Sequence, residues 1–152
     1  MNEHIKKFMR CRNLNKVVFP YKDHKAMWDI LSKWKGKYSL DETKVMEATI
    51  KKKRDTLKQL GYKSFIPGSC LACDANATFI INNMKKKTVR DAYNCDSCPI
   101  DWTNSLGVPV RTCHQIYEMW ENRNGKQKQE LAKMIRDMPL KEGIEKLYNI
   151  IE

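Results

Sequence analysis

Two pairs of cysteines are the strongest chemical signal in this sequence. Cys70-Leu-Ala-Cys73 and Cys95-Asp-Ser-Cys98 share the form Cys-x-x-Cys, with 21 residues between the pairs. Two residues between cysteines let both thiolates turn toward one point, and two such pairs complete a tetrahedral shell of four sulfurs around zinc. We therefore expect one zinc ion bound by Cys70, Cys73, Cys95 and Cys98.

Cys113 is an alternative fourth ligand, because it follows the second pair closely. It also lies on the apolar stripe of a predicted helix, where a buried core thiol is the ordinary interpretation. Cys11 has no partner nearby. A redox role would need only one Cys-x-x-Cys, so two pairs favour metal binding.

The sequence offers little for catalysis. Four thiolates leave no open position on zinc, so the predicted site is structural. Three histidines, at positions 4, 24 and 114, are scattered, and the chain contains neither a phosphate-binding P-loop nor a Gly-x-Ser-x-Gly motif. We predict that the protein is not an enzyme.

The positive charge is concentrated in the first half of the chain. Of the net charge of +11, residues 1–37 supply +7, with ten Lys and Arg against three acids, whereas residues 114–152 are neutral, with seven against seven. This asymmetry suggests a polyanion or an acidic protein surface as partner, although a solvated lysine-rich face explains it equally well. The candidate contact residues are Lys51, Lys52, Lys53, Arg54, Lys85, Lys86 and Lys87.

Apolar residues at helical spacing predict the elements that carry these groups. A short strand over residues 16–19, ended by Pro20, precedes a helix that begins at Asp23 and ends at Gly36. Its buried stripe should be Met27, Ile30, Leu31 and Trp34, extended by Trp28. The next helix should begin with a capping box, Ser39 to Glu42, and end at Gly61. Its buried stripe should be Met46, Ile50, Leu57 and Leu60.

Between the cysteine pairs, residues 77–81 are β-prone and residues 82–83 are turn-prone. A strand, a turn and a second strand would make a hairpin of the zinc-ribbon kind with Lys85–Lys87 at its tip; a short helix over residues 84–92 is the competing assignment. Three short helices should close the chain. Their stripes are Cys113, Ile116, Tyr117 and Trp120, then Leu131, Met134, Ile135 and Met138, then Ile144, Leu147, Tyr148 and Ile151.

The predicted fold class is thus mainly α with a small zinc-stapled β-hairpin insert, in a single compact domain. Along the chain we expect a basic N-terminal segment (1–22), two amphipathic helices (23–61), a zinc-binding module (62–110) and C-terminal helices (111–152). Trp102, four residues after Cys98, could stack on a base, but packing beside the zinc site is the favoured interpretation.

The two cysteine pairs, with Pro99 and Trp102 after the second pair and then Cys113, Tyr117 and Trp120, resemble a loose family of small bacteriophage proteins. Their pattern is C-x-x-C…C-x-x-C-P-[LI]-x-W, followed by Cys and Tyr-x-x-Trp, and the resemblance covers roughly residues 23–124. His24-Lys-Ala-Met-Trp28 resembles a short helix near their start. This chain departs from the family in its longer basic N-terminus and its two additional C-terminal helices.

The resemblance implies a zinc-binding phage accessory protein of no assigned activity that acts in the bacterial cytoplasm. We expect it to bind, and to inhibit or redirect, a host protein complex such as a defence system or the transcription machinery. Direct binding of DNA or RNA is the alternative function.

The first residues lack the apolar segment of a signal peptide, and no apolar run approaches the roughly 20 residues of a membrane span. We therefore expect a cytoplasmic protein with no membrane partner.

Overall fold

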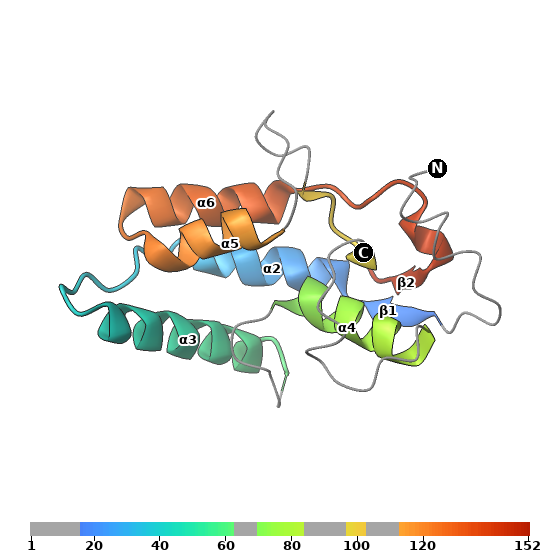
Figure 1. Ribbon diagram of the computed structural model, residues 1–152, viewed down its shortest axis with the longest axis horizontal. Helices are drawn as coiled ribbons and strands as arrows, with labels where there is room; N and C mark the ends of the chain where they lie inside the picture. The colour runs from blue at the N-terminus through green and yellow to red at the C-terminus, as the bar shows by residue number, and fades with distance from the viewer. Residues whose placement is uncertain (1–15, 63–69, 84–96, 103–112) are drawn as a thin grey trace. The chain divides into compact units, whose positions relative to one another are not determined.

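The computed structural model describes residues 16–62, 70–83, 97–102 and 113–152. These residues are mainly helical, with one small sheet of two strands, which confirms the predicted fold class at this level (Figure 1). The chain forms two compact units. We call them the strand unit, which comprises Met1–Lys22, Cys70–Asp101 and Pro139–Glu152, and the helical unit, which comprises Asp23–Ser69 and Trp102–Met138.

The two strands of the strand unit are far apart in the sequence. β1 (Val17–Phe19) and β2 (Tyr148–Ile150) pair in parallel, with Phe19 opposite Ile150. The pairing continues beyond β2, because the N–H of Ile151 donates a hydrogen bond of 3.0 Å to the carbonyl oxygen of Phe19. The sequence predicted β1 correctly.

The segment that contains β2 was predicted to be a third C-terminal helix, and that prediction is wrong. After Gly143, whose φ is +78°, there is only a short 3-10 helix, η3 (Ile144–Lys146), before the chain extends into β2. Ile144, Leu147 and Tyr148 are buried as expected. An isolated helix of this length would be marginal, whereas pairing with β1 supplies backbone hydrogen bonds along the whole strand.

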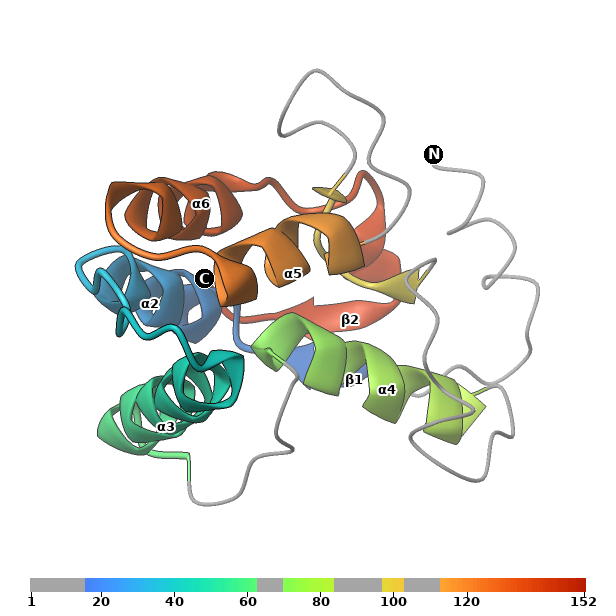
Figure 2. The same cartoon turned by 60° about the vertical axis from the view of Figure 1, so that its left-hand side comes forward.

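The residues after the first cysteine pair form a helix, α4 (Leu71–Asn83), so the strand predicted over residues 77–81 is wrong. Its buried positions form two adjacent i, i+4, i+8 rows: Leu71, Ala75 and Phe79, and Ala72, Asn76 and Ile80. Burying this continuous face against β1, together with the high helix propensity of alanine, outweighs the β-propensity of a three-residue apolar run. Figure 2 shows α4 alongside the two strands. The remainder of the predicted hairpin lies outside the described residues.

The helical unit takes its helices from both of its segments. They are α2 (Tyr21–Leu31), whose first two residues belong to the strand unit, α3 (Glu42–Gln59), α5 (Cys113–Asn122) and α6 (Lys126–Asp137). α5 and α6 lie side by side (Figures 1 and 2). Both were predicted, and their ends at Asn124-Gly125 and Pro139 agree with the structure to within two residues.

Three aromatic side chains form the centre of the helical unit. The rings of Trp28 on α2 and Trp120 on α5 meet edge to face, with centroids 4.9 Å apart and planes at 81°. Tyr117 completes the group, with its centroid 5.9 Å from that of Trp28. Edge-to-face packing brings the positive edge of one ring to the negative face of the next, so these contacts stabilise the unit beyond the area that they bury.

The first turn, the end and the buried face of α2 differ from the prediction, and the helix ends at Leu31 rather than at Gly36. The helix begins at Tyr21, directly after Pro20, rather than at an Asp23 N-cap. Its buried residues are His24, Met27, Trp28 and Leu31, which is the expected i, i+3, i+4, i+7 spacing placed one turn earlier. The sequence missed this register because the first residue of the stripe is a histidine.

The ends of α3 are fixed by local hydrogen bonds. Its N-cap is Asp41, whose carboxylate accepts a hydrogen bond of 3.0 Å from the N–H of Thr43, so the predicted Ser39–Glu42 capping box is wrong. The predicted stop at Gly61 is confirmed: its φ is +98° and its N–H donates to the carbonyl oxygen of Lys58. The N–H of Tyr62 bonds one residue further back, which completes a Schellman motif.

Candidate metal centre and basic hollow

The first cysteine pair lies at the beginning of α4. Cys70 directly precedes the helix and Cys73 belongs to its first turn, where the N–H of Asp74 donates a hydrogen bond of 2.9 Å to the carbonyl oxygen of Cys70. The Cys70 side chain is buried and that of Cys73 is half-buried. A hydrogen bond between the two thiols, together with burial, raises the pKa of the Cys70 thiol. The two thiols therefore lie close to one another, which is a requirement for binding one metal ion.

Of the second pair, the structure describes Cys98, whose side chain is also buried. Its neighbour Ser97 donates a hydrogen bond to the side-chain oxygen of Asn76, one helical turn after Cys73 on α4. The hydroxyl of Tyr148 on β2 donates a bond of 2.7 Å to the carbonyl oxygen of Ser97. The first bond ties the Cys98 segment to the helix that carries the first pair, and the second ties it to β2.

The donor set fits zinc in type, because buried thiols are the ligands that zinc selects in structural sites. Three of the four predicted ligands belong to the strand unit, while Cys95 lies outside the described residues. Within the described ranges no three Cys, His, Asp or Glu side chains gather at one point. Cys113 begins α5 in the helical unit, and its side chain is outside the description. The zinc ion therefore stays a prediction.

The predicted basic cluster on α3 is divided by the structure. Lys51 and Arg54 are exposed and Lys52 is half-buried, but Lys53 is fully buried and donates a hydrogen bond to the hydroxyl of Tyr117. Since consecutive residues on a helix point in different directions, one of four had to face the core. Lys53 is thus removed from the candidate surface. Lys85–Lys87 lie outside the described residues.

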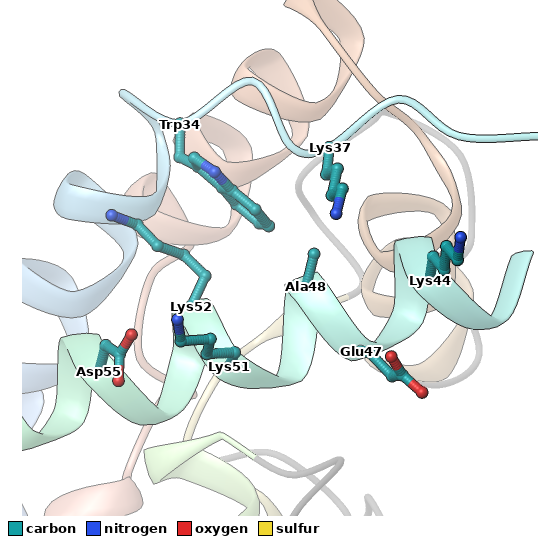
Figure 3. A pocket seen from close by; sticks show the side chains of 8 residues that line it. All are labelled: Trp34, Lys37, Lys44, Glu47, Ala48, Lys51, Lys52 and Asp55. Atoms are coloured by element: carbon teal, nitrogen blue, oxygen red, sulfur yellow. The ribbon is translucent and has the colours of Figure 1, made fainter. Parts of the chain in front are cut away.

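The exposed part of this cluster belongs to a hollow of about 570 Å³ in the helical unit. One wall is α3 and the other is the segment that follows α2 (Figure 3). Four lysines line it against two acidic residues, and one aromatic ring borders it. The lining residues are Trp34, Lys37, Lys44, Glu47, Ala48, Lys51, Lys52 and Asp55. We call this set the basic hollow.

A buried lysine of α6 holds the Trp34 wall of the basic hollow in place. The ammonium of Lys128 lies 5.1 Å from the centre of the Trp34 ring and 4.3 Å from that of Trp120. It donates hydrogen bonds to the carbonyl oxygen of Trp120 and, at 3.3 Å, to the hydroxyl of Thr49 on α3. Burial lowers the pKa of Lys128 to about 8, with Glu121 opposing that shift. The ammonium therefore links α3, α5 and the Trp34 segment to α6.

Gly36 allows the same segment to approach Lys128 closely. Its φ is +79°, and a Cβ atom at this position would stand 2.8 Å from Cδ of Lys128 and 2.5 Å from Oδ1 of Asn124. The carbonyl oxygen of Lys35 accepts a hydrogen bond of 2.6 Å from the N–H of Gly125. Backbone and side-chain contacts thus fix the residues on either side of Gly36, which include Trp34 and Lys37 of the basic hollow.

Two apolar side chains beyond the basic hollow are exposed to solvent. Tyr38 is 79% exposed and Leu40 is 91% exposed, both on the segment between α2 and α3. A single exposed apolar residue is ordinary, but two of them next to a basic concave surface form a candidate contact site. Sequence reasoning missed both, because neither belongs to a periodic pattern.

Trp34 and Trp102 also differ in part from the sequence-based expectation. Trp34 was assigned to a buried stripe, yet it is half-buried and borders the basic hollow. Trp102 is 3% exposed, so it is part of the core and cannot serve as a platform for a base.

No protein-family model, curated protein or solved structure matches this chain. The resemblance to bacteriophage proteins therefore stays a prediction from the spacing of cysteine, proline and tryptophan. Within the described ranges, no helix combines the length and apolar character that crossing a bilayer would require.

Proposed function

We propose that this chain is a non-enzymatic, zinc-binding accessory protein, of the kind that bacteriophages produce, which binds an acidic surface of a host protein complex. The observation that carries the proposal is the proximity in sequence of two kinds of exposed group. The exposed side chains of Tyr38 and Leu40 lie on the segment between α2 and α3, which also carries Lys37 of the basic hollow. The other lysines of the hollow lie on α3, which follows directly.

This combination favours a protein as partner. Protein interfaces place apolar and aromatic anchors among polar groups that set orientation, and a few anchors carry most of the binding energy. Leu40 can gain by burial against an apolar patch, which a phosphate backbone does not offer. The lysines of the basic hollow then favour a partner whose surface near that patch is acidic, and they would accelerate association.

The zinc ion in this proposal is a structural element. Bound by Cys70, Cys73, Cys98 and Cys95, it would join the start of α4 to the segment after it. Thiolate coordination to zinc contributes about 10–16 kcal/mol at neutral pH in small zinc domains, which is as large as the whole stability of an ordinary domain. Zinc would thus hold the strand unit together, and the partner would be bound elsewhere.

The test is capture of the partner by a tagged chain from nuclease-treated bacterial lysate. The wild-type chain is compared with a Tyr38→Ser, Leu40→Ser double variant and with Ile151→Ser, which removes an equally apolar side chain that is 50% exposed in the strand unit. We expect a specific protein that is retained by the wild type and by Ile151→Ser but is lost from the double variant. Equal capture by all three chains, or a protein that is captured from untreated lysate but not from nuclease-treated lysate, would contradict the proposal.

A further inference from the structure

We infer that the basic hollow binds a nucleotide unit of single-stranded nucleic acid, with a base stacked on Trp34 and the phosphates on its lysines. This inference goes beyond the proposed function, because it assigns a second class of ligand to one site, in which Trp34, Lys37 and Lys44 join the predicted contact residues Lys51 and Lys52. A host complex that acts on nucleic acid would present both classes of ligand together.

Trp34 has the geometry of a stacking platform. Lys128, itself fully buried, lies over the ring from the protein interior, and the ring borders the hollow. The contacts of Lys128 and Gly36 described above keep the ring in place before any ligand arrives. A base that stacks on a fixed ring loses little binding free energy to ordering the protein.

The lysines are distributed for a chain of phosphates rather than for a single anion. Lys44 and Lys51 are seven residues apart on α3, which corresponds to about 10 Å along a helix axis. Lys52 follows, and Lys37 approaches from the opposite wall (Figure 3). Four ammonium groups against two carboxylates leave the hollow positive, and the concave wall concentrates that field.

The shape of the hollow also fits this ligand. A volume of about 570 Å³ lies within the range of sites that hold small organic ligands, roughly 300–1,000 Å³. The carboxylates of Glu47 and Asp55 can accept hydrogen bonds from the N–H groups of a base, such as N3–H of thymine. An acidic peptide would use the lysines but would gain nothing from the flat ring of Trp34, whereas an aromatic platform among cations is the usual composition of single-strand binding sites.

The probe is a fluorescently labelled strand of eight thymidines, titrated with purified full-length protein at about 50 mM salt and followed by anisotropy. We expect Trp34→Ala to weaken binding roughly 5- to 150-fold, the range that loss of one stacked base produces. Trp34→Phe, which keeps a stacking face, should remain close to the wild type. Circular dichroism of each variant shows whether it is folded.

Ala48 provides a second variant that does not depend on the packing of Trp34. It lies on α3 within the hollow, so Ala48→Glu places a carboxylate beside the phosphates, while Ala48→Gln fills the same space without charge. We expect binding to weaken at least tenfold with glutamate and less with glutamine. If Ala48→Glu and Ala48→Gln weaken binding equally, the loss comes from the added side-chain volume and not from its charge. That result would contradict the proposed binding of phosphates by the lysines.

The charge contribution is measured from the salt dependence. Lys51→Gln with Lys52→Gln should reduce the log–log salt slope by up to about 1.4, since each phosphate contact on a single strand contributes about 0.7. Arg54→Gln with Lys58→Gln removes two exposed charges from α3 outside the hollow and should have little effect.

Three results would overturn the inference: no binding of the strand at 50 mM salt, equal loss in the two charge pairs, or an unchanged affinity of folded Trp34→Ala. Displacement of the strand by polyglutamate at lower concentration than by unlabelled thymidine strand would also overturn it, in favour of an acidic protein in the hollow. These measurements use the purified chain alone. A negative result in these titrations therefore does not bear on whether the chain captures a host protein. A negative result in the capture experiment likewise does not bear on binding of the thymidine strand.

Discussion

The ammonium of Lys128 lies 4.3 Å from the centre of the Trp120 ring and donates a hydrogen bond of 2.7 Å to the carbonyl oxygen of the same residue. α5 ends at Asn122, so the carbonyl of Trp120 belongs to the last turn, where a helix leaves carbonyl oxygens without partners of its own. Lys128 therefore serves as a C-terminal cap supplied by the neighbouring helix, and a positive charge at that end also complements the helix dipole.

Substitution of Lys128 separates its charge from its packing. We expect Lys128→Met to lower the free energy of unfolding by about 1–2 kcal/mol, because the stem is retained but a buried carbonyl loses its donor. Lys128→Ala should cost about 3 kcal/mol, since it also removes the methylenes that pack near Gly36. Urea denaturation measures both values, and an alanine variant as stable as the methionine variant would refute the packing role.

Gly36→Ala should destabilise the helical unit more than Gly61→Ala does. Both glycines have positive φ, so each substitution carries a strain of about 1 kcal/mol. At Gly36 the new methyl group would also clash with Asn124 and Lys128, whereas at Gly61 nothing lies within 4 Å. We expect an additional loss of roughly 1–2 kcal/mol at Gly36 from overpacking. If both variants lose the same stability in thermal or urea unfolding, the segment around Gly36 shifts to make room for the new methyl group.

The buried histidine of α2 predicts loss of stability in mild acid. Burial lowers the pKa of His24 from 6.5 to about 3, so the imidazole stays neutral in the folded chain. As the pH falls from 6.5 toward 3, the unfolded chain binds a proton that the folded chain does not. Stability therefore decreases as the pH falls, by about 1.4 kcal/mol per pH unit, or about 2 kcal/mol at pH 5.

His24→Leu isolates this effect, because leucine is apolar, of similar size and does not titrate. Urea unfolding of both proteins between pH 7 and 5 should show the wild type losing about 2 kcal/mol of stability relative to His24→Leu, since only the wild type carries the His24 contribution. Other groups that titrate in this range affect both proteins equally. Parallel curves would contradict a neutral buried histidine.

The cysteine pairs predict about one zinc ion per chain by elemental analysis. Cys73→Ser or Cys98→Ser should abolish both metal retention and the folded state, because one lost thiolate opens the site. Cys11→Ser serves as the control that leaves metal content unchanged, and Cys113→Ser distinguishes whether that cysteine replaces Cys95 as a ligand. A chain that stays folded after chelation would exclude a structural zinc ion.

The parts of the fold that sequence predicted well are those with a strong local signal. α5 and α6 follow uninterrupted apolar stripes, and Gly61 ends α3 because its positive φ suits a residue without a side chain. The predictions that failed were the ones that local pattern leaves undecided. Residues 77–81 and 144–151 are compatible with either helix or strand over a few residues, and contacts with β1 determined both.

The candidate sites were predictable to different degrees. The cysteine pairs stand out in the sequence because ligand spacing along a chain is itself the chemical requirement. The basic hollow does not stand out in the sequence, because its residues come from two elements. Trp34 and Lys37 precede α3, whereas Lys44, Lys51 and Lys52 lie along it. Their separation in the sequence gives no indication that they border one space.

The helical character of the chain, the clustering of its positive charge and the thiols available to a metal can be read from the sequence, because they depend on composition and short-range spacing. The burial of Lys53 and Lys128, and the position of Lys51 and Lys52 at the basic hollow, follow only from the packing of the helices. A lysine has a long apolar stem and a charged end, so its place depends on whether hydroxyls, carbonyls and aromatic faces from other helices surround the ammonium.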